Sequence, residues 1–420
     1  MTKSFDQKLS GYADLIVHIG LNVRPGQKVV VSGKNLFRGA PLHSAPLVRK
    51  IVESAYKAGA RFVDVFWDDD QSQLVRFTHA PRDSFEEFPT WRTRALHEYA
   101  ANGDAIVSIY GEDPDLFNGQ DAALVTQAQR TMEKHMQPQM ELLMKNAYNW
   151  LLVSVPHPNW AAKVFPDLPA EQQMDAMWEH IFKLCRIDRD DPVAAWKEHI
   201  AQLNEAAKYL NEKQYDGLHY RAPGTDFTVG LPAGHLWNSA QSDTQGGITF
   251  TPNLPTEEIF TLGDKNRAEG TLKASMPLSY GGRLIEDFSM VFKDGRVVEV
   301  KAGKNEQALK DLLDVDDGAG RVGEIALVPH SSPIAQSGRL FYNTLYDENA
   351  ASHIAVGRAY RFTLKGGENM SAEEFEAAGG NNSLVHVDFM IGSGEMDIDG
   401  ITKDGTKEPL MRKGEWAYKA

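Results

Sequence analysis

A histidine and an aspartate lie two positions apart near the end of this chain. His386 and Asp388 belong to the apolar run 383–391 (SLVHVDFMI), which is typical of a β-strand. Residues two apart on a strand project from the same face, so the two side chains should point together. An imidazole and a carboxylate on one face make half a site for a divalent metal ion. A hydrogen-bonded surface pair explains the same pattern, and for this motif taken alone it is the preferred interpretation.

Three further carboxylates stand at the ends of apolar segments. Glu324 is at the mouth of the run 323–329 (GEIALVP), where burial would require a partner such as a metal ion. Glu257 and Glu258 are neighbours in 252–260 (PNLPTEEIF). Adjacent residues on an extended segment face opposite ways, so only one of these two should enter a given site. A capping or solvated role is the alternative for both.

A second histidine follows a segment of small residues. The run 347–355 (DENAASHIA) predicts a tight helical segment in which Glu348 and Ser352, one turn apart, share a face. His353 would then lie close to Glu348. The alternative is a half-buried histidine whose hydrogen bonds are satisfied by its surroundings.

The elements that must position these residues change character along the chain. The first half alternates short β-branched runs with stretches of helical spacing, which is the pattern of βαβ units and of a parallel sheet. The predicted strands are 27–33, 61–67, 104–110 and 150–155, and the predicted helices are 47–59, 121–146 and a pair within 171–210 that is broken near Asp191-Pro192.

The second half contains short strands and hairpin signals instead. Asp-Gly pairs at 294–295 and 404–405 lie between strand-like runs, which indicates tight β-hairpins. A helix is expected at 305–313. We therefore predict an α/β protein with two domains. Residues 1–215 form an α/β domain with a mainly parallel sheet. Residues 216–420 form an α+β catalytic domain with a mainly antiparallel sheet that carries the metal site.

Composition narrows the range of functions. The 420 residues carry a formal net charge of −14, which disfavours a nucleic-acid partner. Cys185 is the single cysteine, so a cysteine-rich zinc site and an intrachain disulfide are excluded, and its helical spacing predicts a core position. A reducing cytoplasm fits this cysteine usage. No apolar run predicts a membrane span, and no apolar stretch near the N-terminus predicts a signal peptide.

Several common catalytic motifs are missing. The sequence has no His-Glu-x-x-His zinc motif, no G-x-S-x-G nucleophile elbow and no G-x-G-x-x-G dinucleotide loop after a strand. Any metal site must therefore be built from dispersed His, Asp and Glu residues. Residues 216–420 carry 20 basic and 30 acidic side chains, which is most of the net negative charge and includes every candidate ligand.

Four segments of the second half resemble the thermophilic aminopeptidase family, also called aminopeptidase T-like. These segments occur in the family's order and at similar separations. They are 253–260 (NLPTEEIF), 323–329 (GEIALVP), 345–355 (LYDENAASHIA) and 383–392 (SLVHVDFMIG).

The resemblance implies a metallopeptidase with two divalent ions, which could be zinc, cobalt, manganese or magnesium. It implies peptide substrates with a free N-terminus and a homodimer. The net negative charge and the lack of a long apolar run predict neither nucleic acid nor membrane as a partner. Tyr360 matches an active-site tyrosine of the family. The implied metal ligands are Glu258, Glu324, His353, His386 and Asp388.

The chemistry expected from this ligand set is hydrolysis by a water that bridges two ions. Glu324 would be shared by both ions, and Glu257 and Glu348 are the candidates for the group that accepts the water's proton. Glu348 could equally bind a metal ion or the substrate's α-ammonium group. Tyr360 would donate to the oxyanion, although a core tyrosine explains it equally well. The alternatives are a two-metal amidohydrolase or phosphoesterase, or a peptide-binding scaffold without activity.

Overall fold

The chain forms two compact units in the computed structural model, which describes residues 3–34, 39–280 and 283–418. Unit one contains residues 1–199 and 241–255, and unit two contains residues 200–240 and 256–420. The predicted division between residues 215 and 216 differs from this grouping, because residues 200–215 group with unit two and residues 241–255 with unit one. That division into functional domains stays a prediction.

Unit one is built on a parallel four-stranded sheet with the order β3-β1-β5-β6. The central strand forms because three consecutive β-branched valines, 29–31, can be buried on both faces of the sheet. This sheet confirms the predicted parallel arrangement. Its strands are β1 (Lys28–Gly33), β3 (Phe62–Val65), β5 (Ala105–Tyr110) and β6 (Trp150–Ser154), with the short parallel pair β2 (Ala40–Pro41) and β4 (Trp67–Asp68) beside them.

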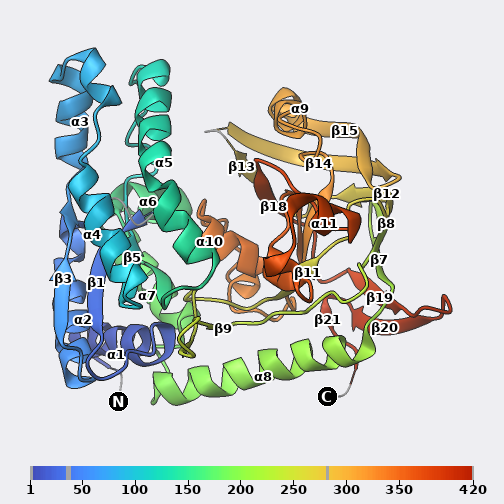
Figure 1. Cartoon of the computed structure of the whole chain (residues 1–420), viewed down its shortest axis with the longest axis horizontal. Coiled ribbons are helices and arrows are strands. Elements are labelled where there is room, and N and C mark those ends of the chain that lie inside the picture. Colours follow the sequence, from blue (N-terminus) through green and yellow to red (C-terminus); the bar gives the residue numbers. More distant parts are fainter. Residues whose placement is uncertain (1–2, 35–38, 281–282, 419–420) are drawn as a thin grey trace. The chain divides into compact units, whose positions relative to one another are not determined.

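Helices cover this sheet (Figure 1). Part of the core joins Val30 and Ile106 of the sheet to Leu96 of α4 and Met136 of α5. Cys185 is fully buried just after α7, as its spacing predicted. The helices of unit one are α1 (Phe5–Leu15), α2 (Ala45–Lys57), α3 (Asp70–His79), α4 (Thr90–Ala101), α5 (Ala122–Met144), α6 (Pro158–Val164) and α7 (Ala170–Leu184), and a small ribbon pairs β9 (Ser242–Asp243) with β10 (Thr249–Phe250). Helix α8 (Pro192–Lys213) begins in unit one, and from Ile200 it belongs to unit two.

Unit two contains two antiparallel sheets, as the hairpin signals predicted. The smaller sheet has the order β11-β16-β17-β18 and carries the candidate site. Its strands are β11 (Ile259–Leu262), β16 (Val322–Leu327), β17 (His353–Gly357) and β18 (His386–Met390). Phe389 of β18 contacts Phe288 of the larger sheet, with ring centroids 5.7 Å apart. The two sheets therefore share an aromatic core on the face of β18 opposite to His386 and Asp388.

The larger sheet packs against the smaller one through the contact of Phe288 with Phe389. Both predicted hairpins belong to it, and Asp294 and Gly295 turn with positive φ angles of 49° and 78° between β14 and β15. The strands are β7 (Gly217–Ala222), β8 (Thr225–Gly230), β12 (Ala268–Lys273), β13 (Leu278–Tyr280), β14 (Arg283–Lys293), β15 (Arg296–Lys304), β19 (Asp397–Ile401), β20 (Lys407–Arg412) and β21 (Glu415–Trp416). The helices are α9 (Glu306–Leu313), which was predicted, α10 (Thr344–Asp347) and α11 (Ala372–Ala377).

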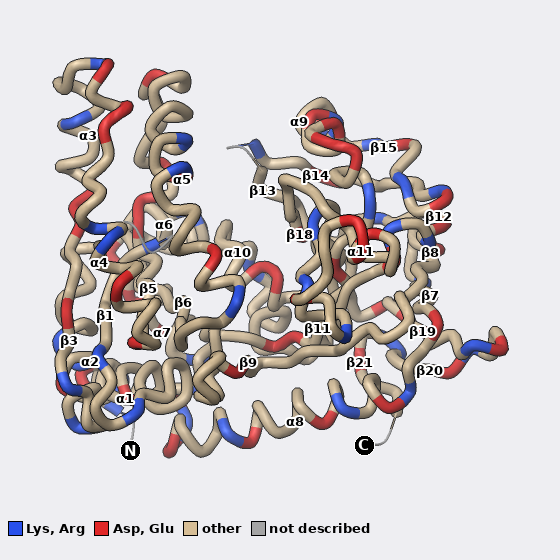
Figure 2. The backbone as a smooth tube through the Cα atoms, viewed as in Figure 1, with Lys and Arg blue, Asp and Glu red and all other residues tan. Residues whose placement is uncertain are grey.

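Charges of both signs are interspersed along the chain rather than gathered by sign. Figure 2 shows this along α8, where Lys197 is followed by Glu198, and Glu212 by Lys213. Within the described ranges, none of the helices combines the length and the apolar character that a bilayer crossing requires.

Candidate metal centre

Strand register brings Glu324 and Asp388 to the same face of the smaller sheet. Glu324 of β16 lies opposite Ala355 of β17, and Ala355 lies opposite Asp388 of β18. Directly opposed residues of antiparallel strands project from the same face. The two carboxylates are therefore separated by a single alanine side chain, which leaves free volume between them. Ala355 itself is fully buried.

A second row of opposed residues lies next to the first. Phe260 of β11, Ala326 of β16 and His353 of β17 follow one another across the sheet. His353 and Ala355 are two apart, so His353 shares the face of the first row. Glu258 is two residues before Phe260, and continuing the alternation places it on this face as well. Again an alanine, Ala326, occupies the central position and leaves space above the sheet.

The first group of potential ligands consists of Glu258, Glu324 and His353, all buried. The Nε2 atom of His353 lies 3.2 Å from Oε2 of Glu258 and 3.7 Å from Oε1 of Glu324. Nδ1 of the same imidazole is 3.1 Å from the carbonyl oxygen of Ala351, to which it donates. This bond leaves Nε2 facing the carboxylates, the orientation usual for a histidine that binds a metal ion.

The second group consists of Glu324, His386 and Asp388. Nε2 of His386 lies 3.5 Å from Oδ1 of Asp388 and 3.8 Å from Oε2 of Glu324. Its Nδ1 donates to the carbonyl oxygen of Arg358 at 2.7 Å, which again leaves Nε2 for the site. Glu324 belongs to both groups and directs one carboxylate oxygen at each imidazole.

The pKa values of both histidines, of Asp388 and of Glu324 are shifted from their ordinary values. Burial opposes the charged form of His386, but the Asp388 carboxylate and then Glu324 outweigh it and raise the pKa of His386 to about 10. Burial likewise opposes ionisation of Asp388, but His386 outweighs it and lowers the pKa of Asp388 to about 2. Burial also opposes protonation of His353, yet Glu258 and Glu324 hold its pKa well above the usual value. Burial raises the pKa of Glu324.

The side chains present fit divalent cations. One oxygen each of Glu258, Glu324 and Asp388 (Oε2, Oε2 and Oδ1) is buried and makes no hydrogen bond, and its nearest polar neighbour is an imidazole Nε2 atom. Buried carboxylate oxygens are costly unless they are paired or bind a metal ion. Two imidazoles and three carboxylates form a mixed nitrogen and oxygen donor set, which suits zinc, cobalt or manganese, and magnesium through its oxygens.

Glu348 lies at the edge of this set and is half-buried. Burial raises its pKa well above the usual value, and the negative charges of Glu258 and Asp388 raise it further. The turn Glu348–Ala350 also contacts strand β18, which carries His386 and Asp388. A carboxyl group with a raised pKa can carry a proton near neutral pH.

Tyr360 also stands beside the cluster. Its ring lies 4.8 Å from the ring of His386 and stacks on Phe362, with centroids 5.3 Å apart. Burial raises the pKa of Tyr360 well above 10, and the carboxylates of Glu324 and Asp388 raise it further. Its hydroxyl therefore stays protonated and can act as a hydrogen-bond donor.

Glu257 belongs to neither group of potential ligands. It is buried, and its backbone N–H donates to Oδ1 of Asn349 at 2.7 Å. If the alternation of β11 continues through the preceding residues, Glu257 faces the side opposite to Glu258.

The predicted helical segment around Glu348 is wrong in its extent. The helix ends with the short 3₁₀ turn Glu348–Ala350, and Ala351 is extended (φ −158°, ψ 156°). Ser352 instead bonds the backbone of Val328, accepting from its N–H and donating to its carbonyl, each at 3.1 Å. These two bonds join Ser352 to the end of β16, and strand β17 begins with the next residue, His353. Similarly, Glu324 lies inside β16 rather than at its mouth.

The strand register identifies further residues that the sequence patterns did not indicate. Ala326 and Ala355 provide the space above the sheet, and Asn349 contacts the segment that carries Glu258. The alternation of small and charged residues in β16 and β17 is the signal that could have indicated the alanines. No local sequence pattern indicates Asn349, because its hydrogen-bond partner is 92 positions away in the chain.

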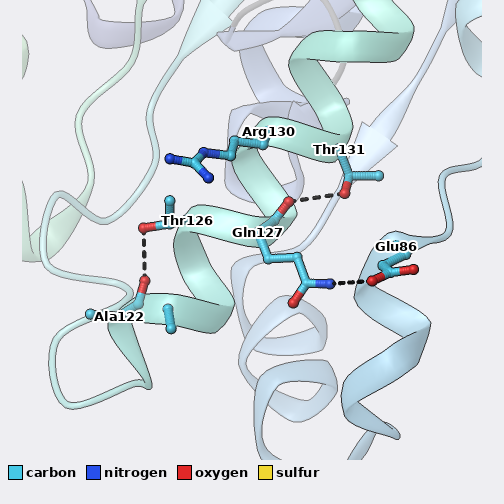
Figure 3. Close-up of a pocket in the computed structure, with 7 residues that line it drawn as sticks. Glu86, Ala122, Thr126, Gln127, Arg130 and Thr131 are labelled. Atoms are coloured by element: carbon cyan, nitrogen blue, oxygen red, sulfur yellow. Dashed lines mark hydrogen bonds between the residues drawn. The ribbon is translucent and has the colours of Figure 1, made fainter. Parts of the chain in front are cut away.

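A hollow in unit one has a different character. A groove of about 650 Å³ runs along α5, and Gln127 in its lining donates to Glu86 at 3.0 Å. Figure 3 shows the residues that line it. Its lining is mostly small and hydroxyl side chains with one cation, Arg130. It contains no set of residues suited to a metal ion, so the site in unit two remains the stronger candidate.

Known proteins resemble this chain over almost its whole length. The family model described as thermophilic metalloprotease (M29) matches residues 5–416. Aminopeptidase 2 of Geobacillus stearothermophilus is 47% identical over 414 residues, which cover 99% of this chain and 98% of that protein. Aminopeptidase AmpS of Bacillus subtilis (strain 168) is 44% identical over 415 residues, which cover 99% of this chain and 100% of that protein.

A solved structure gives the same result for the fold. Wild-type AmpT from Thermus thermophilus matches with a TM-score of 0.91 at 42% identity, covering 99% of this chain and 100% of that one. The mixed α/β fold predicted from the sequence is therefore confirmed, and the resemblance first visible in four segments extends along the chain.

Proposed function

This chain belongs to the thermophilic metalloprotease family M29, and from that premise we propose that it is a metal-dependent aminopeptidase. It is a hydrolase of peptide bonds, and its substrates are peptides with a free N-terminus. The observation that carries the proposal is the position of Glu324, whose two carboxylate oxygens face two separate His and carboxylate groups.

The proposed site holds two divalent ions. Glu258 and His353 would bind one ion, His386 and Asp388 the other, and Glu324 would bridge them. The two overlapping groups of potential ligands support this arrangement, as do the buried carboxylate oxygens without hydrogen-bond partners. Zinc, cobalt, manganese and magnesium remain the candidate ions, because a mixed set of imidazole and carboxylate ligands does not select among them.

When bound, a pair of divalent ions lowers the pKa of a bridging water and polarises the scissile carbonyl. The protein's own groups then have distinct tasks. Glu348 accepts the water's proton and later donates it to the leaving amine, a role for which its raised pKa suits it. Glu257 is the weaker candidate for this task because it belongs to neither group of potential ligands.

The hydroxyl of Tyr360 donates to the oxygen that becomes negative in the tetrahedral state. Its position beside His386 and its raised pKa support this role. An acidic environment around the site also favours the α-ammonium group of a free N-terminus. Glu348 could supply that contact instead of moving the proton.

We also propose a homodimer in the cytoplasm. The dimer follows from the family resemblance, and the cytoplasm from the single buried cysteine, which is compatible with a reducing compartment. Size-exclusion chromatography with light scattering would test the oligomeric state, and a monomer at micromolar concentration would contradict it.

An activity assay separates this proposal from its alternatives. Purified protein is incubated with aminoacyl nitroanilides and with their N-acetylated forms, with chelator, without it, and after divalent metal is restored. We expect cleavage of the free-amine substrates alone, loss of activity with chelator and its return with metal. Cleavage of the acetylated forms, or of amides or phosphoesters instead, would indicate another two-metal hydrolase. Metal binding without any hydrolysis would indicate a scaffold.

A further inference from the structure

The side chain of Asn349 joins two segments that are far apart in the sequence. Asn349 is fully buried and follows Glu348 directly in the chain. Its Oδ1 accepts a hydrogen bond from the backbone N–H of Glu257 at 2.7 Å, and its Nδ2 donates to the carbonyl of Leu345 at 3.1 Å. Its own carbonyl accepts from the hydroxyl of Ser332 at 2.8 Å. Both ends of the amide are therefore satisfied inside the protein.

Glu257, whose backbone N–H bonds to Asn349, lies just before the first strand of the smaller sheet. Strand β11 begins at Ile259, and its pairing with β16 begins there as well. Glu257 and Glu258 precede this ladder, and the backbone N–H of Glu257 donates to the Asn349 side chain. A buried N–H group needs an acceptor, and Asn349 supplies it.

We propose that Asn349 is a positioning residue which holds the Glu257–Glu258 segment against the Glu348 turn, and so places the Glu258 carboxylate for its metal ion. The inference rests on the two-metal site of the proposed function. Asn349 acts through the backbone of Glu257 and touches neither metal nor substrate. It couples the segment that carries Glu258, a ligand, to the turn that carries Glu348, the proton carrier, so that the two carboxylates keep their mutual placement.

The chain offers a matched control for the loss of such an amide. Asn211 of α8 makes the same pair of bonds, since its Oδ1 accepts from the N–H of Trp237 at 2.8 Å and its Nδ2 donates to the carbonyl of Trp237 at 2.9 Å. It lies in unit two, and Asn238, the neighbour of Trp237, pairs with the backbone of Phe260 in β11. Asn211→Ala therefore loosens the surroundings of β11 without removing the acceptor of the Glu257 N–H, so it separates a general loosening from the specific loss at Glu257.

Amide hydrogen exchange of the full-length protein without metal gives a direct readout. In Asn349→Ala, exchange at Glu257 should be faster by about tenfold or more, because its N–H loses the acceptor. In Asn349→Asp, which keeps an acceptor oxygen but loses the donor to Leu345, exchange at Glu257 should stay slow. In Asn211→Ala, exchange at Glu257 should match the wild type.

Zinc titration gives the second readout. We expect Asn349→Ala to weaken one of two binding steps by about 10-fold to 100-fold and to leave the other unchanged. Asn349→Asp should recover most of the lost affinity, and it serves as the test variant if Asn349→Ala does not fold. Unchanged exchange at Glu257 and unchanged zinc affinity in Asn349→Ala, or losses equal to those of Asn211→Ala, would overturn the inference.

The two proposals fail in different ways. If the wild type binds two zinc ions but cleaves no aminoacyl substrate, the proposed function fails while Asn349 is still judged by exchange and affinity. If the wild type is an active aminopeptidase and Asn349→Ala binds both ions as tightly as before, the function stands and the role of Asn349 is refuted.

Discussion

Ala355 lies directly opposite Asp388 across strands β17 and β18, with Glu324 on its other side. A methyl group at this position leaves the space between two carboxylates open. The ligand residues alone do not make the site, since the strands beneath must also carry small side chains there. This relationship yields the first prediction.

Ala355→Leu should fill the space between Glu324 and Asp388. Overpacking of this kind costs roughly 1–3 kcal/mol of stability, so the protein should remain folded while it loses bound metal and activity. The control is Val356→Phe, which enlarges the neighbouring residue on the opposite face of β17. It should lower stability by a similar amount and keep its metal. Metal analysis combined with thermal unfolding checks both, and full metal content in Ala355→Leu would contradict the account.

Tyr360→Phe should remove the hydrogen bond to the oxyanion and little else. We expect kcat to fall by about 100-fold, with KM and metal content near the wild-type values. Phe362→Leu removes the stacked neighbour of Tyr360 without removing a hydroxyl, so it should have a much smaller effect on kcat. Steady-state kinetics with an aminoacyl nitroanilide measures this. An unaltered kcat would show that Tyr360 only packs against its neighbours and does not donate to the oxyanion.

Metal binding should release protons at pH 7. His386, with a pKa near 10, and His353, with a raised pKa, are protonated in the metal-free protein, whereas a metal ion binds the neutral imidazole. Affinity should therefore increase as the pH rises from 6 to 8. Calorimetric titration in buffers of different ionisation enthalpy should give at least about two protons per chain, and about one fewer for His386→Gln. Affinity that is independent of pH would contradict these protonation states.

Asp347 should make the stability of the protein depend on pH. Burial raises its pKa to about 7, although the backbone N–H groups of Phe341 and Asn343 donate to its carboxylate. An aspartate in the unfolded chain titrates near about 4. Between about pH 4 and pH 7 the folded state holds one more proton, so this group's contribution to stability falls as pH rises through that window and is constant above it.

Asp347→Asn removes this titration. The free energy of unfolding of the variant, relative to that of the wild type, should therefore increase between pH 5 and pH 8, whatever its absolute value. Urea denaturation of metal-free protein at several pH values measures the difference. A difference that does not vary with pH would show that Asp347 titrates normally.

Local periodicity was enough to predict much of the fold and part of the site. The valines of β1 and the Asp-Gly turns indicated the parallel and antiparallel sheets, because strand and turn preferences act over a few residues. Strand alternation alone placed His386 and Asp388 on one face. The same rule separated Glu257 from Glu258.

The rest of the site depends on contacts between distant segments. The small residues before His353 suggested a helix, but the two bonds of Ser352 with Val328 turn the chain into a strand. Tertiary contacts of this kind override local preference. Which strands are neighbours, and hence that Ala355 lies between Glu324 and Asp388, follows from long-range pairing that no local pattern encodes.

The central claim is that Glu324 bridges two metal ions. Crystals of the protein grown with zinc or manganese, with anomalous scattering measured at the metal edge, test it most directly. We predict two anomalous peaks about 3.5–4 Å apart, each next to one carboxylate oxygen of Glu324, with Glu258 and His353 at one peak and His386 and Asp388 at the other. A single peak, or two peaks of which Glu324 contacts only one, would contradict the account.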